Sequence, residues 1–162
     1  MLLLLMRHGI AEEPETWEGE DATRPLTNEG KKKTRAIAER LSTLVDEVDL
    51  IASSPLVRAR QTAEIVQKAF HRAPLATWPE LEDAQYSALV KRLKTLEIKS
   101  ALLVGHEPSL GTFAARCLTG KADGFALEMK KAGVCALEVD WSTPGARAVL
   151  LWHTSPKLLR AP

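Results

Sequence analysis

The sequence predicts an α/β fold, in which a mostly parallel sheet is covered by helices on both faces and extended by antiparallel strands at its C-terminal end. Three apolar runs, Leu2–Met6, Asp49–Ser53 (DLIAS) and Ala101–Val104, have the pattern of strands buried on both faces. Helix-periodic segments alternate with these runs, and such alternation is typical of a parallel sheet. The last third of the chain is richer in short strands and turns.

The first two predicted helices each follow one of the apolar runs. A polar segment from Gly9 to Pro25 is expected to be a surface loop, and Thr27 is a suitable N-cap for a helix that runs to about Val45. Ser54 and Pro55 have the pattern of an N-cap and a first helical residue. The apolar faces of these two helices consist of Ile37, Leu41 and Leu44, and of Ala59, Ala63, Val66 and Phe70. Glu29 is expected to pair with Lys32 or Lys33.

The second half continues the alternation and then changes character. A short strand is predicted at Leu75–Trp78, a helix is marked by Tyr86, Leu89, Leu93 and Leu96, and another helix follows Pro108 and ends before Gly120. The remaining strands are predicted at Phe125–Met129, Val134–Val139 and Ala146–Trp152, with turns at Ala132-Gly133 and Pro144-Gly145.

Composition limits the classes of protein that the chain could represent. The 162 residues, of which 45% are hydrophobic and 27% charged, suit a single domain over 1–162. The net charge of +1 gives no electrostatic argument for nucleic acid or a membrane surface as a partner. Cys117 and Cys135 lie in apolar contexts and are expected to be buried thiols. The apolar start is too short for a signal peptide, so we expect a cytoplasmic protein.

Polar residues follow each of the three apolar runs. The first predicted strand leads into Arg7 and His8, the second into two serines and then Arg58, and the third into Gly105 and His106. Ligands of open α/β sheets bind beyond the carboxyl ends of the strands, so these side chains are expected to meet at one site.

The residue types at this expected site suit phosphoryl transfer. Two arginines offer planar, permanently charged forks to phosphate oxygens. Of two histidines, one can act as the nucleophile while the other donates a hydrogen bond to the transferring group. Nearby arginines should lower the pKa of His8 and keep it neutral. A lone Arg-His-Gly triplet would be a weak signal, and Arg58 alone could be a surface residue, so the prediction depends on the three strand ends together.

At these residues the sequence resembles the histidine phosphatase superfamily, also called phosphoglycerate-mutase-like. The matching segments are LLLMRHGIA at the amino end, RPLTNEG at 24–30, IASSPLVRARQTAEIV at 51–66 and LLVGHEPSL at 102–110. The compact length and the RPLT element are most similar to SixA-type phosphohistidine phosphatases. The resemblance implies a three-layer α/β/α sandwich, a phosphohistidine intermediate on His8, and a phosphate pocket made by Arg7, Arg58 and His106. It also implies that Arg24 lies near the site.

The resemblance leaves the proton donor open. Larger family members have an acidic donor after the second helix, and the corresponding segment here reads WPELEDAQYSALV. Glu80, Glu82 and Asp83 are candidates, with Glu80 taken as the candidate general acid, and all three could equally be solvated loop residues. A weak acid signal suits a labile P–N bond, because imidazole leaves more readily than an alkoxide.

We therefore expect a metal-independent phosphatase without a cofactor. No Asp-rich constellation accompanies the site, and two arginines supply positive charge. The preferred substrate is phosphohistidine on a partner protein, such as a phosphotransfer domain, because little sequence remains to cap a small molecule. The alternative enzyme is a phosphatase of small phosphomonoesters, and the alternative outside enzymes is a phosphate- or phosphoprotein-binding module. Nucleic acid and membranes are not expected as partners.

Overall fold

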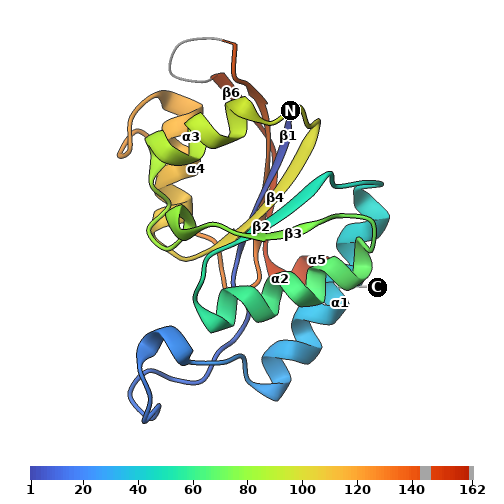
Figure 1. Ribbon diagram of the computed structural model, residues 1–162, viewed down its shortest axis with the longest axis vertical. Coiled ribbons are helices and arrows are strands. Elements are labelled where there is room, and N and C mark those ends of the chain that lie inside the picture. Colours follow the sequence, from blue (N-terminus) through green and yellow to red (C-terminus); the bar gives the residue numbers. More distant parts are fainter. Residues whose placement is uncertain (143–146, 161–162) are drawn as a thin grey trace.

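The computed structural model describes residues 1–142 and 147–160, which form a six-stranded sheet between two layers of helices (Figure 1). The strand order across the sheet is β3-β2-β4-β1-β5-β6. The strands are β1 (Leu2–Arg7), β2 (Leu50–Ser53), β3 (Leu75–Thr77), β4 (Ser100–Gly105), β5 (Val134–Asp140) and β6 (Arg147–Thr154). The helices are α1 (Asn28–Leu44), α2 (Val57–Ala69), α3 (Tyr86–Thr95), α4 (Ser109–Thr119) and α5 (Pro156–Leu159), with short 3₁₀ turns η1 (Asp21–Thr23) and η2 (Pro79–Leu81).

The strand directions confirm a mostly parallel sheet with antiparallel C-terminal strands. β1, β4, β2 and β3 are parallel, whereas β5 is antiparallel to β1 and β6 to β5. In the register of the central strands, Arg7 lies opposite Gly105 and Ser53 lies opposite Val104. The carboxyl ends of β1, β2 and β4 therefore reach the same edge of the sheet, as the sequence predicts.

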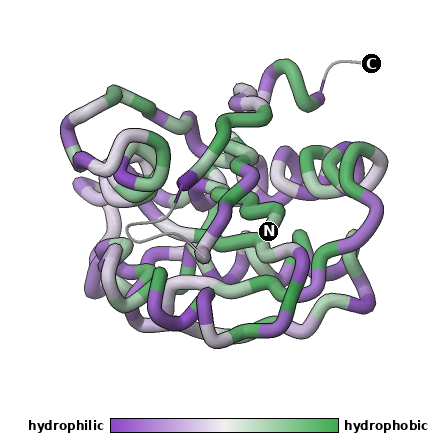
Figure 2. Tube along the Cα trace, turned by 90° about the horizontal axis from the view of Figure 1, so that it is seen from above, coloured by the Kyte–Doolittle hydropathy of each residue, from purple (hydrophilic) through white to green (hydrophobic). Residues whose placement is uncertain are grey.

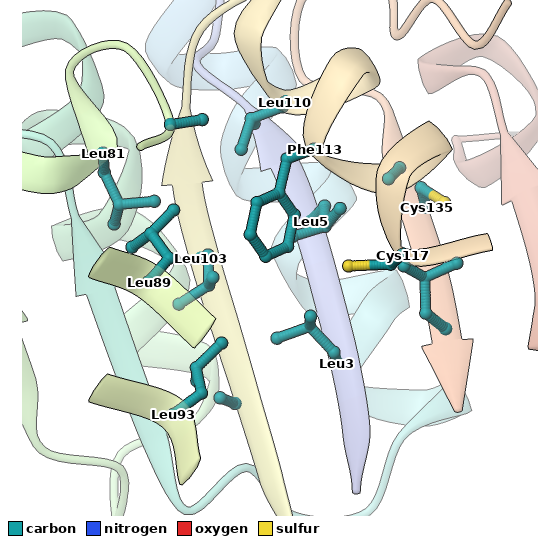
Figure 3. Packing of buried hydrophobic residues seen from close by; sticks show 14 of the residues in the cluster. Leu3, Leu5, Leu81, Leu89, Leu93, Leu103, Leu110, Phe113, Cys117 and Cys135 are labelled. Atoms are coloured by element: carbon teal, nitrogen blue, oxygen red, sulfur yellow. The ribbon is translucent and has the colours of Figure 1, made fainter. Parts of the chain in front are cut away.

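Alternate residues of the central strands face different helix layers. Leu3 and Leu5 pack with the layer of α3 and α4, around the fully buried ring of Phe113 (Figure 3). Leu4 and Met6 pack on the opposite face with α1, α2 and α5. Because the side chains of a strand point alternately to its two faces, both faces carry an apolar core, and the three-layer α/β/α arrangement is confirmed.

The helices present one apolar face to the sheet. Figure 2 shows hydrophobic and hydrophilic residues alternating along the helical turns. At the start of α1, the Thr27 hydroxyl accepts a hydrogen bond from the Gly30 N–H at 2.9 Å, which confirms the predicted N-cap. The predicted pair between Glu29 and Lys33 also forms. The prediction that Leu44 lies on the buried face is wrong, because Leu44 ends α1 with 54% exposure.

The predicted start of the second helix is wrong by two residues. α2 begins at Val57, not at Pro55. The Ser54 N–H still donates to the Val104 carbonyl at 3.0 Å, so the backbone at this point continues the sheet. The Ser54 hydroxyl is bound to His106 at 2.8 Å, which gives this serine a role other than that of a simple helix cap.

The strand predicted at Phe125–Met129 is also wrong, because this segment is irregular. Its polar backbone groups bind side chains: the Met129 N–H donates to Glu107 at 3.4 Å, and the Met129 carbonyl accepts from Arg7 at 2.9 Å. The predicted turn at Ala132-Gly133 is present, whereas the one at Pro144-Gly145 lies outside the described residues.

Two further findings concern the chain as a whole. In the ranges 1–142 and 147–160, no helix is long and apolar enough to cross a membrane. Cys117 and Cys135 are free and buried, as expected.

Candidate active site

Four of the predicted site residues converge at the carboxyl edge of the sheet. Arg7 ends β1 and His8 follows it, Arg58 is the second residue of α2, and His106 follows β4. The rings of His8 and His106 lie with their centroids 5.2 Å apart. The charges of Arg7 and Arg58 both contribute to lowering the pKa values of the two histidines. We call this group of four side chains the phosphate site, because the sequence predicts that they bind phosphate.

His8 is held as a neutral imidazole with one nitrogen free. Its Nδ1 lies 2.8 Å from the Gly9 carbonyl oxygen, and since a carbonyl can only accept, Nδ1 carries the proton. Nε2 then keeps its lone pair. Burial is the main cause that lowers the pKa of His8 to about 3, and the positive charges of Arg58 and Arg7 act in the same direction. The ring can therefore act as a nucleophile at neutral pH.

His106 is oriented by Ser54. Its Nε2 lies 2.8 Å from the Ser54 hydroxyl, and that hydroxyl also accepts a hydrogen bond from the Leu56 N–H at 3.3 Å. This arrangement favours donation of the hydroxyl proton to Nε2, which places the ring proton on Nδ1. Burial lowers the pKa of His106 to about 4, so it is also neutral. Its Nδ1–H is then available as a donor.

Three buried nitrogens of the phosphate site have no hydrogen-bond partner within the described residues. They are Nε of Arg7, Nε of Arg58 and Nδ1 of His106. A buried donor without a partner costs free energy, and native proteins rarely leave one so. An anion bound beside His8 would satisfy all three. The charged forks and the neutral donor match the oxygens of a phosphoryl group.

Arg7 is held in position by the irregular segment that precedes β5. The Nη1 of Arg7 donates to the Met129 carbonyl at 2.9 Å. The backbone N–H of Met129 in turn donates to the carboxylate of Glu107. Glu107 is half-buried, and burial raises the pKa of its carboxyl group. Sequence reasoning missed this support, because Met129 acts through its backbone and its side chain carries no sign of the role.

Arg24 lies near the site, as predicted, but it is connected through a residue that sequence reasoning missed. Asp21 accepts from Arg24 Nε at 2.9 Å and forms an ion pair with Arg58 Nη2 at 2.9 Å. The hydrogen bond from Arg24 is the main cause that lowers the pKa of Asp21. The signal available in the sequence was an acid three residues before Arg24, in a loop that contains many acids.

Glu80, the predicted candidate acid, pairs with another residue. It lies in η2, and its Oε1 is 2.9 Å from Nη2 of Arg92 on α3. Glu82 and Asp83 are exposed. Burial lowers the pKa of Arg58, and of these three acids Glu82 is the one whose charge opposes that shift. The structure therefore brings together Arg7, His8, Arg58 and His106, with Arg24 beside them, and leaves Glu80 in a separate ion pair.

The RPLTNEG segment and the loop after His8 are packed directly together. A Cβ atom at Gly30 would lie 2.0 Å from the carbonyl oxygen of Ile10, which is far too close. That carbonyl accepts the Thr27 N–H at 3.0 Å. Glycine at position 30 thus lets α1 fix the backbone that follows the histidine.

The side chains of the site are nitrogen donors. Among the described residues, no group of three or more His, Cys, Asp or Glu side chains is placed to hold a metal ion.

Comparison with known sequences places this site in a family. A family profile for the histidine phosphatase superfamily (branch 1) matches residues 3–101. An uncharacterized protein of Picosynechococcus sp. is 36% identical over 98% of this chain and 99% of its own length. The phosphohistidine phosphatase SixA of Escherichia coli is 30% identical over 75% of this chain and 76% of its own length.

Solved structures agree with the sequence comparison. The protein histidine phosphatase SixA complexed with tungstate matches with a TM-score of 0.84 and 27% identity, over 98% of this chain and 99% of that one. A mycobacterial glucosyl-3-phosphoglycerate phosphatase shares the fold, with a TM-score of 0.79 and 19% identity over 95% of this chain and 99% of its own. The profile spans more than half of the described chain. The chain thus belongs to the histidine phosphatase superfamily and is a hydrolytic phosphatase of the SixA type.

Proposed function

We propose that this phosphatase removes the phosphoryl group from phosphohistidine on a partner protein, through a phosphohistidine intermediate on His8. The observation that carries the proposal is the set of unpartnered buried nitrogens of Arg7, Arg58 and His106 beside a neutral His8. The name of the Escherichia coli relative, a phosphohistidine phosphatase, supports the substrate class.

In the first step, the Nε2 lone pair of His8 attacks phosphorus and forms a new P–N bond. The P–N bond of the substrate breaks, and its electron pair returns to the ring nitrogen that held phosphorus. Because the other ring nitrogen of the partner already carries a proton, the imidazole leaves as a neutral molecule. Arg7, Arg58 and His106 donate to the equatorial oxygens, where charge develops. In the second step, water attacks the phosphorus on His8, inorganic phosphate leaves, and Nε2 regains its electron pair.

The positive charge for these steps comes from the protein itself. Two guanidinium groups can neutralise the transferring phosphoryl group, so the mechanism needs no metal ion. The Nδ1–H bond of His8 to Gly9 fixes the tautomer whose Nε2 attacks.

The leaving group decides between phosphohistidine and a phosphomonoester. An alkoxide needs a proton as it departs, whereas imidazole can leave as a neutral molecule. Oε1 of Glu80 pairs with Arg92 while its Oε2 is buried without a partner among the described residues, and Glu82 and Asp83 are exposed. A site with this sparse supply of acids suits the P–N bond better than the P–O bond of an ester.

A direct comparison of substrates tests the proposal. The purified chain should show a kcat/KM on a phosphohistidine-bearing phosphotransfer domain at least about tenfold above that on simple phosphomonoesters, a difference of about 1.4 kcal/mol in barrier. Rapid alkaline quench should trap an acid-labile phosphoenzyme. His8→Ala should abolish both signals, and His71→Ala, which alters an exposed histidine after α2, should leave them intact.

Three other outcomes would contradict the proposed function. Faster turnover of a phosphomonoester would favour the small-molecule alternative, and label on a residue other than His8 would refute the intermediate. Binding of phosphoprotein without turnover would favour the binding-module alternative.

A further inference from the structure

A basic cleft lies next to the phosphate site. Its volume is about 470 Å3, and it runs between α1, the segment before β5 and α5. One carboxylate, Glu128, lines it, against six cationic residues: Arg7, Lys33, Lys130, Lys131, Lys157 and Arg160. The whole chain has a net charge of only +1, so this concentration of positive charge is local.

Arg7 is shared by the basic cleft and the phosphate site. It lines the cleft, while its charge lowers the pKa values of His8 and His106. Its Nη1 is held by the Met129 carbonyl, on the segment that forms one wall of the cleft. A chain lying in the cleft would therefore reach the phosphate site at Arg7.

The positive charges of the cleft include unpaired residues and residues held only in exposed ion pairs. Lys157 and Arg160 form no ion pair within 4.0 Å in the part of the chain that the structure describes. Lys33 pairs with Glu29, Lys131 with Glu13 at 3.6 Å and Lys130 with Glu128 at 3.4 Å, but all three carboxylates are largely exposed. Exposed pairs contribute little free energy, so an incoming anion can replace them.

Gathering like charges costs free energy unless an anion offsets the repulsion. The volume of the cleft far exceeds that of one phosphate and falls in the range typical of ligand pockets. The ligand that fits this combination is a segment with several carboxylates.

We infer that the basic cleft docks an acidic segment of the partner protein, so that the enzyme prefers phosphohistidine flanked by Asp and Glu. This inference rests on the proposed function and specifies its substrate class. Docking beside Arg7 would raise the local concentration of the phosphohistidine at His8 without a new contact to the reacting atoms.

Two phosphohistidine peptides of equal length test the inference. One carries four Asp or Glu residues beside the phosphohistidine, and the other carries Asn and Gln at the same positions. We expect kcat/KM for the acidic peptide to be higher by at least about tenfold at low salt, mainly through KM, and the preference to shrink as salt rises.

The paired variants locate the effect. Lys157→Glu/Arg160→Glu should remove the preference while leaving turnover of the Asn/Gln peptide within about twofold, as is usual for rim charges. The matched control is Lys91→Glu/Lys94→Glu on α3, which makes the same charge change on the opposite helix layer. Equal losses in both variants, or no preference in the unaltered enzyme, would overturn the inference.

A binding measurement separates this inference from the proposed function. The unphosphorylated acidic peptide, labelled with a fluorophore, should bind by anisotropy and bind more weakly to Lys157→Glu/Arg160→Glu but not to the α3 control. Such binding would support docking of the acidic segment in the basic cleft, even if neither peptide were turned over. Absence of turnover would refute the proposed function alone. Equal binding to all three proteins would refute the inference that the acidic segment docks in the basic cleft.

Discussion

Asp21 binds Arg58 through both its carboxylate and its backbone. Oδ2 of Asp21 lies 2.9 Å from Nη2 of Arg58, and the Asp21 carbonyl accepts from Nη1 at 2.8 Å. The other carboxylate oxygen holds Arg24. One loop residue thus fixes two arginines and leaves Nε of Arg58 as the nitrogen without a partner.

Asp21→Ala should impair catalysis without unfolding the protein. Hydrogen bonds to charged groups contribute about 1.5–3 kcal/mol, so kcat/KM should fall by about tenfold to about a hundredfold as the arginines lose their restraint. The Tm should change little, because the Asp21 side chain is 58% exposed. Glu20→Ala, which removes the neighbouring exposed acid, is the control. Higher activity in Asp21→Ala would instead show that the carboxylate competes with substrate for Arg58.

Arg58→Lys should lose activity although it keeps the charge. Lysine cannot supply the planar fork, and removing one preorganised donor typically costs about 10²–10³ in kcat. Arg60→Lys changes an exposed arginine on the same helix and should be neutral. Steady-state kinetics on the phosphohistidine protein measure both, and near-normal kcat in Arg58→Lys would remove Arg58 from the proposed mechanism.

The acids after β3 should be dispensable for a phosphohistidine substrate. Glu80→Gln, Glu82→Gln and Asp83→Asn should each cost much less than the 10²–10⁴-fold, roughly, that loss of a general acid costs. A phosphomonoester with a basic leaving group should suffer more from the same changes. If any one variant loses a hundredfold or so on phosphohistidine, that residue is a true general acid and the acid-poor site is refuted.

Acid should destabilise the fold through the two site histidines. Burial lowers the pKa values of His8 and His106 to about 3 and about 4, from an ordinary value of 6.5. At pH values between the lowered native pKa and the ordinary value of 6.5, the unfolded chain binds more protons than the native protein. The free energy of unfolding is therefore greatest above about pH 6.5 and falls as the pH drops toward 4. Urea unfolding at pH 7 and pH 4.5 measures the loss.

Variants assign that loss to the buried rings. His106→Gln should lose less stability between the two pH values than the unaltered protein. His71→Gln, at an exposed position, should lose as much stability as the unaltered protein. The same drop in all three would refute the assignment. Inorganic phosphate should also raise the pKa of His106, followed by NMR, because an adjacent anion favours the charged ring.

The strand ends were predictable because burial and topology act together. A strand buried on both faces needs an unbroken apolar run, so β1 and β4 are visible in the sequence, and the polar residue that follows each run marks the sheet edge. Arg7 and His106 are found in this way. Their convergence follows from the parallel register and does not depend on side-chain detail.

Contacts made by loops could not be predicted, because they follow no periodicity. Asp21 lies among many acids, and nothing local distinguishes it from Glu20. Phe125–Met129 has the composition of a strand, yet its backbone binds Arg7 and Glu107, which are far away in sequence. The observed start of α2 differs from the predicted one for a similar reason, since tertiary contacts of Ser54 outweigh its local capping preference.

The two buried cysteines provide an intrinsic probe of core opening. Both lie among the packed side chains around Phe113 (Figure 3), and burial raises the pKa of each thiol to about 12. Alkylating reagents attack the thiolate, so the folded enzyme should resist them and react only while α4 or β5 is detached. The rate of thiol labelling in native buffer then reports how often the layer that carries α4 separates from the sheet, without any engineered reporter group.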